Sequence, residues 1–252
     1  MSYRMPGSSE ARVAGFDPQV QPVLPTTPLP PLSPACLRLD VIRQAFRHPA
    51  DWQVEPLFAQ SFIPGGDSYV RARQAAVLMP LVQREAGLYM LFTRRAEHLH
   101  DHAGQISFPG GRIESSDSGP VAAAIRETRE EIGVESRFID IFGTQPTLLT
   151  TTQFLMTPVV GELLPGFRIR PDEAEVAEVF EVPLAFLMDP GRHALHRMES
   201  SLGHGRCYFA IRWQSHFIWG ATAILIRNLY YFLAASQGMA VPGTAAAGNR
   251  GT

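Results

Sequence analysis

Hydrophobic residues recur along the chain in patterns that predict a mixture of strands and helices. Two strand-like runs at residues 75–82 and 88–92 are joined by a turn around residues 85–87. Further strands are expected at residues 139–142, 156–163, 176–182 and 208–213. Helices are expected at residues 39–46, 183–188 and 218–233. Mixed strands with helices on both faces predict an α/β fold in three layers.

The two ends of the chain differ from its centre in composition. Residues 1–36 are rich in Pro, Gly, Ser and Thr, which resist helix and sheet, so we expect a flexible N-terminal arm. A polyproline docking segment centred on residues 22–31 is the alternative. Residues 236–252 are mostly small and polar and predict a flexible tail. One domain over residues 37–235 would then carry stability and function, and removing the arm would affect neither.

The overall composition is that of an ordinary globular enzyme. The 252 residues are 45% hydrophobic and 18% charged, enough for one sizeable core. A net charge of −2 gives no general attraction to nucleic acid or to an anionic membrane. No signal peptide or membrane-spanning run is visible, and the two cysteines, Cys36 and Cys207, suggest neither a disulfide framework nor a zinc site. These features predict a cytoplasmic protein and leave the number of subunits open.

Residues 120–132 carry the clearest helix signals. Asp117 and Ser118 are candidate N-caps, and Pro120 suits the first turn, where its missing N–H costs nothing. Gly133 stands where a left-handed residue would end the helix. The preceding residues 108–111, Phe-Pro-Gly-Gly, predict a strand end and a sharp turn that allows close approach of a phosphate group.

Three glutamates on this helix predict a metal site. Glu127, Glu130 and Glu131 are related by i+3 and i+4, so their carboxylates share one face. Like charges at that spacing disfavour a helix by roughly 0.2–0.5 kcal/mol per pair. Mg²⁺ takes oxygen ligands and bridges to substrate phosphates, so a metal–diphosphate site accounts for the acidic face. Arg126 can reach Glu130 at i+4.

The glycine turn and acidic helix resemble the signature of Nudix hydrolases, G-x5-E-x7-R-E-U-x-E-E-x-G-U, with U apolar. The second half agrees at Arg126, Glu127, Glu130, Glu131, Gly133 and Val134. The first half departs, since five residues separate Gly111 from Asp117, which stands in place of Glu, and eight more precede Arg126. Thr128 replaces the usual apolar residue.

The upstream segment resembles one Nudix subgroup, the coenzyme A diphosphatases, whose pattern is L-[LIV]-T-x-R-[SA]-x3-R-x3-G-x3-F-P-G-G. Agreement is found at Leu91, Thr93, Arg95, Ala96, Gly104 and residues 108–111. Phe92 and His100 depart from the pattern. The shifted spacing after Gly111 is also typical of this subgroup. The resemblance covers about residues 37–235 and implies a Nudix-type α/β/α sandwich with a mixed β-sheet.

The resemblance implies a reaction and a role for each site residue. Coenzyme A (CoA) or acyl-CoA would be split into 3′,5′-ADP and 4′-phosphopantetheine or its acylated form, with Mg²⁺ or Mn²⁺ bound. Glu127 and Glu131 would be the main ligands, Glu130 would bind a second ion, and Arg126 would brace the acids. Glu178 is a candidate for an extra ligand or base. The expected substrate-binding residues are Gly110, Gly111, Arg94 and Arg95.

Several alternatives remain open at this point. Another nucleoside diphosphate derivative, such as ADP-ribose or NADH, is a possible substrate, and a Nudix-fold binding module without catalysis is a second reading. His98, His100 and His102 with Asp101 resemble a zinc motif of metallo-β-lactamase-like hydrolases, one residue short in spacing. Arg71, Arg73, Arg94 and Arg95 form a basic cluster for an anionic substrate, or else are solvated strand-edge residues.

Overall fold

The computed structural model describes residues 16–62, 69, 71–99, 102–198 and 206–239. His100, Asp101, the first fifteen residues and nearly all of the predicted tail lie outside this part of the chain. The strands are β1 Val23–Leu24, β2 Arg73–Arg84, β3 Gly87–Arg95, β4 Ile106–Ser107, β5 Gly110–Arg112, β6 Ile139–Thr144, β7 Leu148–Leu149, β8 Phe154–Leu163, β9 Val176–Pro183, β10 His193–Met198, β11 Arg206–Trp213 and β12 His216–Trp219. The α-helices are α1 Leu39–Arg47, α3 Pro120–Ile132, α4 Leu184–Leu187 and α5 Ala221–Ser236, and the 3-10 helices are η1 Pro34–Cys36, η2 Pro56–Ser61, η3 Ser136–Phe138 and η4 Pro190–Arg192.

Over the described residues, the strands form one sheet of eight strands and a second of four. The larger sheet is mixed: β2 runs antiparallel to β3 and β5 but parallel to β8. Strands β4, β3, β2, β8 and β6 follow one another across it, with β9 paired to β3 and β7 to β8. The smaller sheet is antiparallel, in the order β1, β10, β11, β12.

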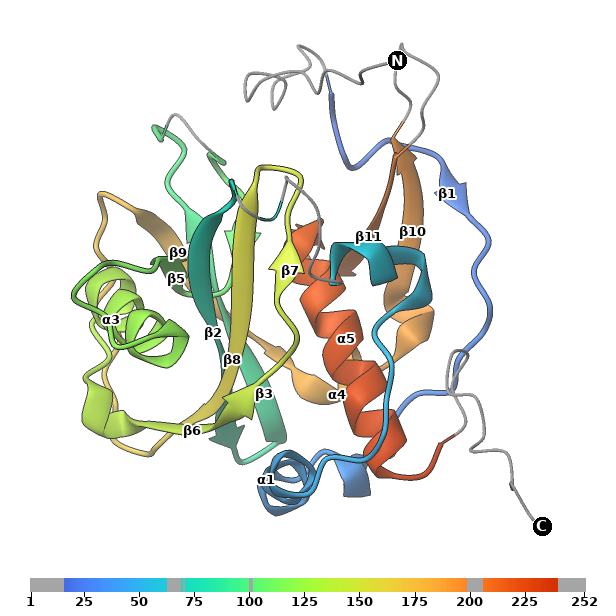
Figure 1. The fold of residues 1–252 in the computed structure, drawn as a ribbon, viewed down its shortest axis with the longest axis horizontal. Coiled ribbons are helices and arrows are strands. Elements are labelled where there is room, and N and C mark those ends of the chain that lie inside the picture. Colours follow the sequence, from blue (N-terminus) through green and yellow to red (C-terminus); the bar gives the residue numbers. More distant parts are fainter. Residues whose placement is uncertain (1–15, 63–68, 70, 100–101, 199–205, 240–252) are drawn as a thin grey trace.

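The larger sheet is covered on both faces, which confirms the predicted α/β sandwich with a mixed sheet. All eight residues of β2 from Ala75 to Val82 are buried, as expected for a strand with no face in water. Helix α3 packs against Ala76 and Leu78 on one face, and Val77 and Met79 face the core that contains α5. Figure 1 shows α3 on one side of the sheet, and α5 on the other side beside β10 and β11.

The C-terminal helix begins later than the sequence pattern suggests. Ile218 and Trp219 belong to β12, where Ile218 pairs with Ile211, and α5 starts at Ala221. Apolar residues alone do not separate a buried strand from a buried helix, whereas Gly220 at φ 64° marks the break between them. The burial of the helix is as predicted, since Thr222 to Ala235 are all buried.

The prediction of a flexible arm over residues 1–36 is wrong for the described part, residues 16–36. Val23 and Leu24 pair with β10, and Leu32 is 4% exposed. Two buried tyrosines donate hydrogen bonds to carbonyls of the arm, Tyr208 to Pro18 at 2.6 Å and Tyr230 to Pro30 at 2.7 Å. Proline cannot donate a backbone hydrogen bond, but its carbonyl still accepts one, so the domain anchors a segment that has little structure of its own.

Candidate active site

Helix α3 begins and ends where the chain makes two unusual backbone turns. The predicted N-caps Asp117 and Ser118 are wrong: the N-cap is Gly119 at φ 145°, with no side-chain capping bond, and Pro120 opens the first turn. The predicted end is confirmed, because Gly133 adopts the left-handed conformation at φ 70° and its N–H bonds to the carbonyl of Arg129.

Asp117 serves the site in a different way from capping. It accepts hydrogen bonds from Nε of Arg126 at 3.0 Å and from Nη2 at 2.9 Å, a bidentate pair. The N–H of Glu114 also donates to Asp117, at 2.8 Å. The hydrogen bonds from Arg126 and Glu114 hold the pKa of Asp117 below its usual range. Asp117 therefore ties the loop before α3 to the residue that precedes Glu127.

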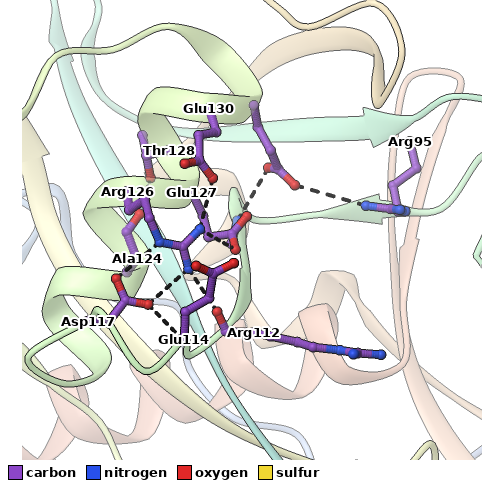
Figure 2. Close-up of polar contacts among 11 residues, drawn as sticks. Arg95, Arg112, Glu114, Asp117, Ala124, Arg126, Glu127, Thr128 and Glu130 are labelled. Carbon is purple, nitrogen blue, oxygen red and sulfur yellow. Dashed lines mark hydrogen bonds and ion pairs between the residues drawn. The ribbon is translucent and has the colours of Figure 1, made fainter.

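Arg126 lies at the centre of the acidic cluster (Figure 2). Its Nη1 donates to Glu127 at 2.9 Å and to Glu130 at 2.8 Å, and its Nη2 donates to the carbonyl of Arg112 at 2.9 Å. The hydrogen bond to Asp117 contributes most to raising the pKa of Arg126 above its ordinary value. The guanidinium thus offsets the repulsion between acids on one helix face.

The side chain of Thr128, which departs from the apolar consensus, is satisfied inside the helix. It is fully buried, and its hydroxyl donates to the carbonyl of Ala124 at 2.6 Å. A threonine at i can make this bond to i−4 without any partner outside the helix, so a polar residue is tolerated here.

Glu131 is the most deeply placed of the three glutamates. It is 5% exposed, accepts from the N–H of Gly110 at 3.3 Å, and has Nη1 of Arg95 at 4.0 Å. Burial raises the pKa of Glu131 to about 8, with Glu127 and Glu175 adding to the shift and Gly110 and Arg95 opposing it. Burial also raises the pKa of Glu127, against the effect of Arg126. The surroundings of Glu127 and Glu131 therefore favour the protonated form of each carboxyl group more than water does.

The glycine turn packs against Glu127 of α3 at Gly111 and against β2 at Gly110. A Cβ on Gly111 would lie 2.5 Å from Oε1 of Glu127, and one on Gly110 would lie 2.3 Å from the carbonyl oxygen of Ala76. Gly110 has φ 157°, a conformation that side chains disfavour. Glycine at 111 therefore lets the backbone approach Glu127, and glycine at 110 lets it pack against β2.

The two arginines at the end of β3, Arg94 and Arg95, contact different acids. Arg95 approaches Glu131, whereas Nε of Arg94 donates to Glu178 at 2.9 Å and its Nη1 reaches Glu97 at 3.4 Å. The register of β3 against β9 shifts between Arg94 and Arg95, and the two side chains contact different acids. The structure brings Arg95, Gly110 and Gly111 to the glutamates but does not bring Arg94 there.

A fourth acid near the glutamates is Glu175, which the sequence pattern did not single out. Its negative charge raises the pKa of both Glu127 and Glu131. Its loop is fixed by two backbone bonds of 2.9 Å, from Asp172 N–H to the Glu131 carbonyl and from Ala96 N–H to the Glu175 carbonyl. A loop residue has no periodicity, so no sequence signal distinguishes it.

Glu178, the predicted extra acid, has partners elsewhere. It accepts from His216 at 3.0 Å and from Arg94, and His216 stacks on Phe180 with ring centroids 3.8 Å apart. Burial acts to raise the pKa of Glu178, but the hydrogen bonds from His216 and Arg94 outweigh it and lower this pKa. This carboxylate links the two sheets through β12.

Within the described residues, no three His, Cys, Asp or Glu side chains already converge in a metal-binding arrangement. Glu127 and Glu130 both point to Arg126 (Figure 2). Of the zinc alternative, His102 is described, and its Nδ1 lies 2.6 Å from the amide oxygen of Gln105. Two members of that motif fall outside the described residues, and the described ones form no zinc set.

No helix in the described ranges is long and apolar enough to cross a membrane.

Comparisons with known proteins agree with this geometry. The family model described as "NUDIX domain" matches residues 72–198. The "Uncharacterized Nudix hydrolase NudL" of Enterobacter sp. (strain 638) is 42% identical over 159 residues, which cover 62% of this chain and 81% of the relative. The protein of the same name from Salmonella paratyphi B (strain ATCC BAA-1250 / SPB7) is 43% identical over 160 residues, covering 62% and 81%.

Solved Nudix structures overlap with part of the chain. The Nudix hydrolase RenU of M. Smegmatis is 24% identical, with a TM-score of 0.38, and the overlap covers 45% of this chain and 71% of that protein. The NUDIX domain of Shewanella oneidensis NrtR, complexed with ADP ribose, is 19% identical, with a TM-score of 0.37. That overlap covers 50% of this chain and 83% of the NrtR domain chain. Overlaps of this extent carry no argument about substrate.

Proposed function

The chain belongs to the Nudix family of hydrolases, and we propose that its substrate is the diphosphate of CoA or an acyl-CoA, cleaved with Mg²⁺ or Mn²⁺. The products are 3′,5′-ADP and 4′-phosphopantetheine or its acylated form. One observation carries the proposal. The segment that resembles CoA diphosphatases, from Leu91 to Gly111, ends in the turn that contacts Glu127 and Glu131. The residues that set this subgroup apart are therefore connected directly to the acidic site.

The donor set fits a divalent ion. Three carboxylates share one face of α3, and Glu131 is buried beside the N–H of Gly110. Burial raises the pKa of Glu131 because it disfavours the ionised carboxylate, and a bound cation would stabilise that ionised form. Glu127 and Glu131 would hold an ion directly, and Glu130, half exposed, would hold a second one directly or through water. Such ions neutralise diphosphate charge and lower the pKa of bound water. Nudix hydrolases generally use divalent metal ions.

The remaining residues orient the substrate and the ligands. Arg126, fixed by Asp117 and the Arg112 carbonyl, holds Glu127 and Glu130 in place. Arg95 and the backbone of Gly110 and Gly111 line the diphosphate. In place of Glu178, we propose Glu175 as the extra acid, because its charge acts on both main ligands. Arg94 is assigned to the Glu178 contact rather than to substrate.

Two other readings are less well supported. A non-catalytic Nudix-fold module has no need of an intact acidic face, and this chain keeps Glu127, Glu130 and Glu131. Another nucleoside diphosphate derivative, such as ADP-ribose or NADH, would use the same glutamates but would not need the upstream pattern. We further propose a cytoplasmic enzyme, consistent with the free thiols of Cys36 and Cys207, that acts on a small molecule and not on nucleic acid or membranes.

A substrate panel tests the proposal. Purified protein with Mg²⁺ or Mn²⁺ is incubated with CoA, dephospho-CoA, ADP-ribose, NADH or a diadenosine polyphosphate, and the products are separated by chromatography. CoA should show the highest kcat/KM, because its 3′-phosphate and pantetheine arm both give contacts usable at the transition state. Equal or faster cleavage of ADP-ribose would reject the CoA assignment and leave the family assignment intact.

A further inference from the structure

Two arginines converge on one aromatic ring where β2 and β8 begin and β5 ends. The guanidinium carbon of Arg73 lies 4.1 Å from the centroid of the Phe154 ring, and that of Arg112 lies 5.8 Å from it. The residues come from three strands, β2, β5 and β8. Arg73 is in register with Phe154, and Arg112 pairs with Ala75, two residues along β2 from Arg73. Residues at i and i+2 of a strand share a face, so the sheet itself brings the two arginines together.

No acid among the described residues matches the positive charge of this pair. Among the described residues, neither Arg73 nor Arg112 has a carboxylate oxygen within 4 Å, whereas Arg126, Arg94 and Arg84 each pair with at least one acid. Both guanidiniums are carried by exposed residues. A ring contact at an exposed site is a weak interaction and neutralises no charge. As far as the described part of the chain is concerned, the pair is therefore available to bind an anion.

The position of Arg112 connects the pair to the acidic site. Arg112 directly follows Gly110 and Gly111, and its carbonyl accepts a hydrogen bond from Arg126 at 2.9 Å. Its side chain extends away from the cluster of Arg126 and Asp117 (Figure 2). One residue thus has its backbone beside the acidic cluster and its guanidinium directed away from that cluster.

We propose that Arg73 and Arg112 form a subsite for a phosphate monoester on the ribose next to the scissile diphosphate, and that Phe154 positions the guanidinium of Arg73. In the CoA reaction this group is the 3′-phosphate, so the inference rests on the proposed function and adds the residues that select for it. Guanidinium groups bind phosphate oxygens through paired, charge-assisted hydrogen bonds. A substrate without the monoester leaves both cations unpaired, which is the basis of discrimination.

Binding of the nucleotide product tests this subsite without catalysis. Titration calorimetry compares adenosine 3′,5′-bisphosphate with AMP, using the wild type and the double variant Arg73→Gln/Arg112→Gln. The wild type should bind the bisphosphate at least tenfold more tightly, and the double variant should bind both nucleotides about equally. Phe154→Leu should reduce the preference by less than the double variant, with AMP affinity retained, because the ring acts through Arg73.

The matched control is Arg168→Gln/Arg170→Gln. It removes the same charge from two exposed arginines that line a different pocket, beside Gly133 and Phe138. This control should keep the preference for the bisphosphate over AMP. If the control also lost that preference, overall positive charge would explain the binding, and the subsite proposal would be overturned. Equal binding of the two nucleotides by the wild type, or a full preference in the Arg73→Gln/Arg112→Gln variant with an unchanged melting temperature, would overturn it as well. CoA hydrolysis by the wild type is measured separately. If the wild type did not hydrolyse CoA but still preferred the bisphosphate through Arg73 and Arg112, the proposed reaction would be rejected and the subsite would be retained.

Discussion

At the scale of single residues, the site depends on how charge is placed around Arg126. Its hydrogen bonds to Asp117, Glu127 and Glu130 hold three acids around one cation, while Glu131 is buried out of its reach beside Gly110. The glutamates therefore differ in environment although they share one helix face. Glu130 is half exposed and Glu131 is 5% exposed, so they should differ in how strongly activity depends on them.

Removal of the proposed ligands should abolish activity without unfolding the protein. EDTA should stop the reaction, and Mg²⁺ or Mn²⁺ should restore it. Glu127→Gln and Glu131→Gln should each lower kcat by two orders of magnitude or more, because each removes a charge that holds the ion. Steady-state kinetics and thermal melts measure both effects. Glu135→Gln, a change at an exposed acid paired with Arg137, is the control and should have normal turnover. Near-normal kcat in either ligand variant would disprove the assignment.

His193 predicts a dependence of stability on pH. Burial and the positive charge of Arg227 lower its pKa to about 4, and its Nε2 lies 2.8 Å from the carbonyl oxygen of Leu187. An unfolded histidine titrates near 6.5. Between these values the unfolded chain binds the additional proton, so stability should fall as the pH drops from about 6.5 to about 4 and should not change through this group above 6.5.

Urea unfolding at pH 7 and pH 5 checks this prediction. The free energy of unfolding of the wild type should fall more between the two pH values than that of His193→Gln, since each pKa unit corresponds to about 1.4 kcal/mol. The comparison with the variant cancels the carboxylates that titrate in the same range. Identical pH dependence in the two proteins would show that His193 is not the group responsible.

At the scale of elements, the N-terminal segment acts as part of the fold. It adds β1 to the smaller sheet, and its carbonyls are hydrogen-bonded by Tyr208 and Tyr230. Deleting residues 1–34 should therefore lower the free energy of unfolding by roughly 3 kcal/mol or more, from the lost burial of Leu32 and the lost hydrogen bonds.

Chemical denaturation of two truncated proteins measures the contribution of this segment. The control lacks only residues 1–15 and keeps every contact named above, so its stability should stay near that of the full chain. If the two truncations were equally stable, the contacts of residues 16–34 would contribute nothing, and the flexible-arm interpretation would be restored.

At the scale of the whole molecule, a buried ion pair connects distant parts of the chain. Arg227 on α5 donates to Glu55, which precedes η2, and both side chains are 5% exposed or less. The N–H of Glu55 also donates to Asn228 at 2.9 Å, and Arg227 lies over the ring of Phe209. These contacts join α5, β11 and the segment before the larger sheet.

Breaking this pair from one side should be costly. Glu55→Gln leaves the cation of Arg227 buried without its counter-charge, which should destabilise the fold by about 3–5 kcal/mol. The double variant Glu55→Gln/Arg227→Met should recover a large part of that loss, because no buried charge remains. Denaturant unfolding of both variants gives the comparison. A loss below about 1 kcal/mol in the single variant would contradict the prediction.

Local signals were sufficient for much of the fold and for the shared helix face of the three glutamates. Gly133 ends α3 as the sequence predicts, and Glu127, Glu130 and Glu131 share a face because helical spacing is fixed by the backbone. Runs of buried residues marked β2, β3, β8 and β9 with ends displaced by a few residues. Each of these features depends on neighbours within a few positions along the chain, so it can be predicted from a single sequence.

Only the tertiary structure decided which groups meet. Arg94 and Arg95 are adjacent in sequence but contact different acids, and Glu175, not Glu178, acts on the glutamates. The proline-rich segment looks unstructured by itself, yet Tyr230, two hundred positions away, hydrogen-bonds it. Contacts of this kind depend on strand order, register and the packing of two sheets. Composition and periodicity determine what each segment can form, and long-range packing determines what that segment touches.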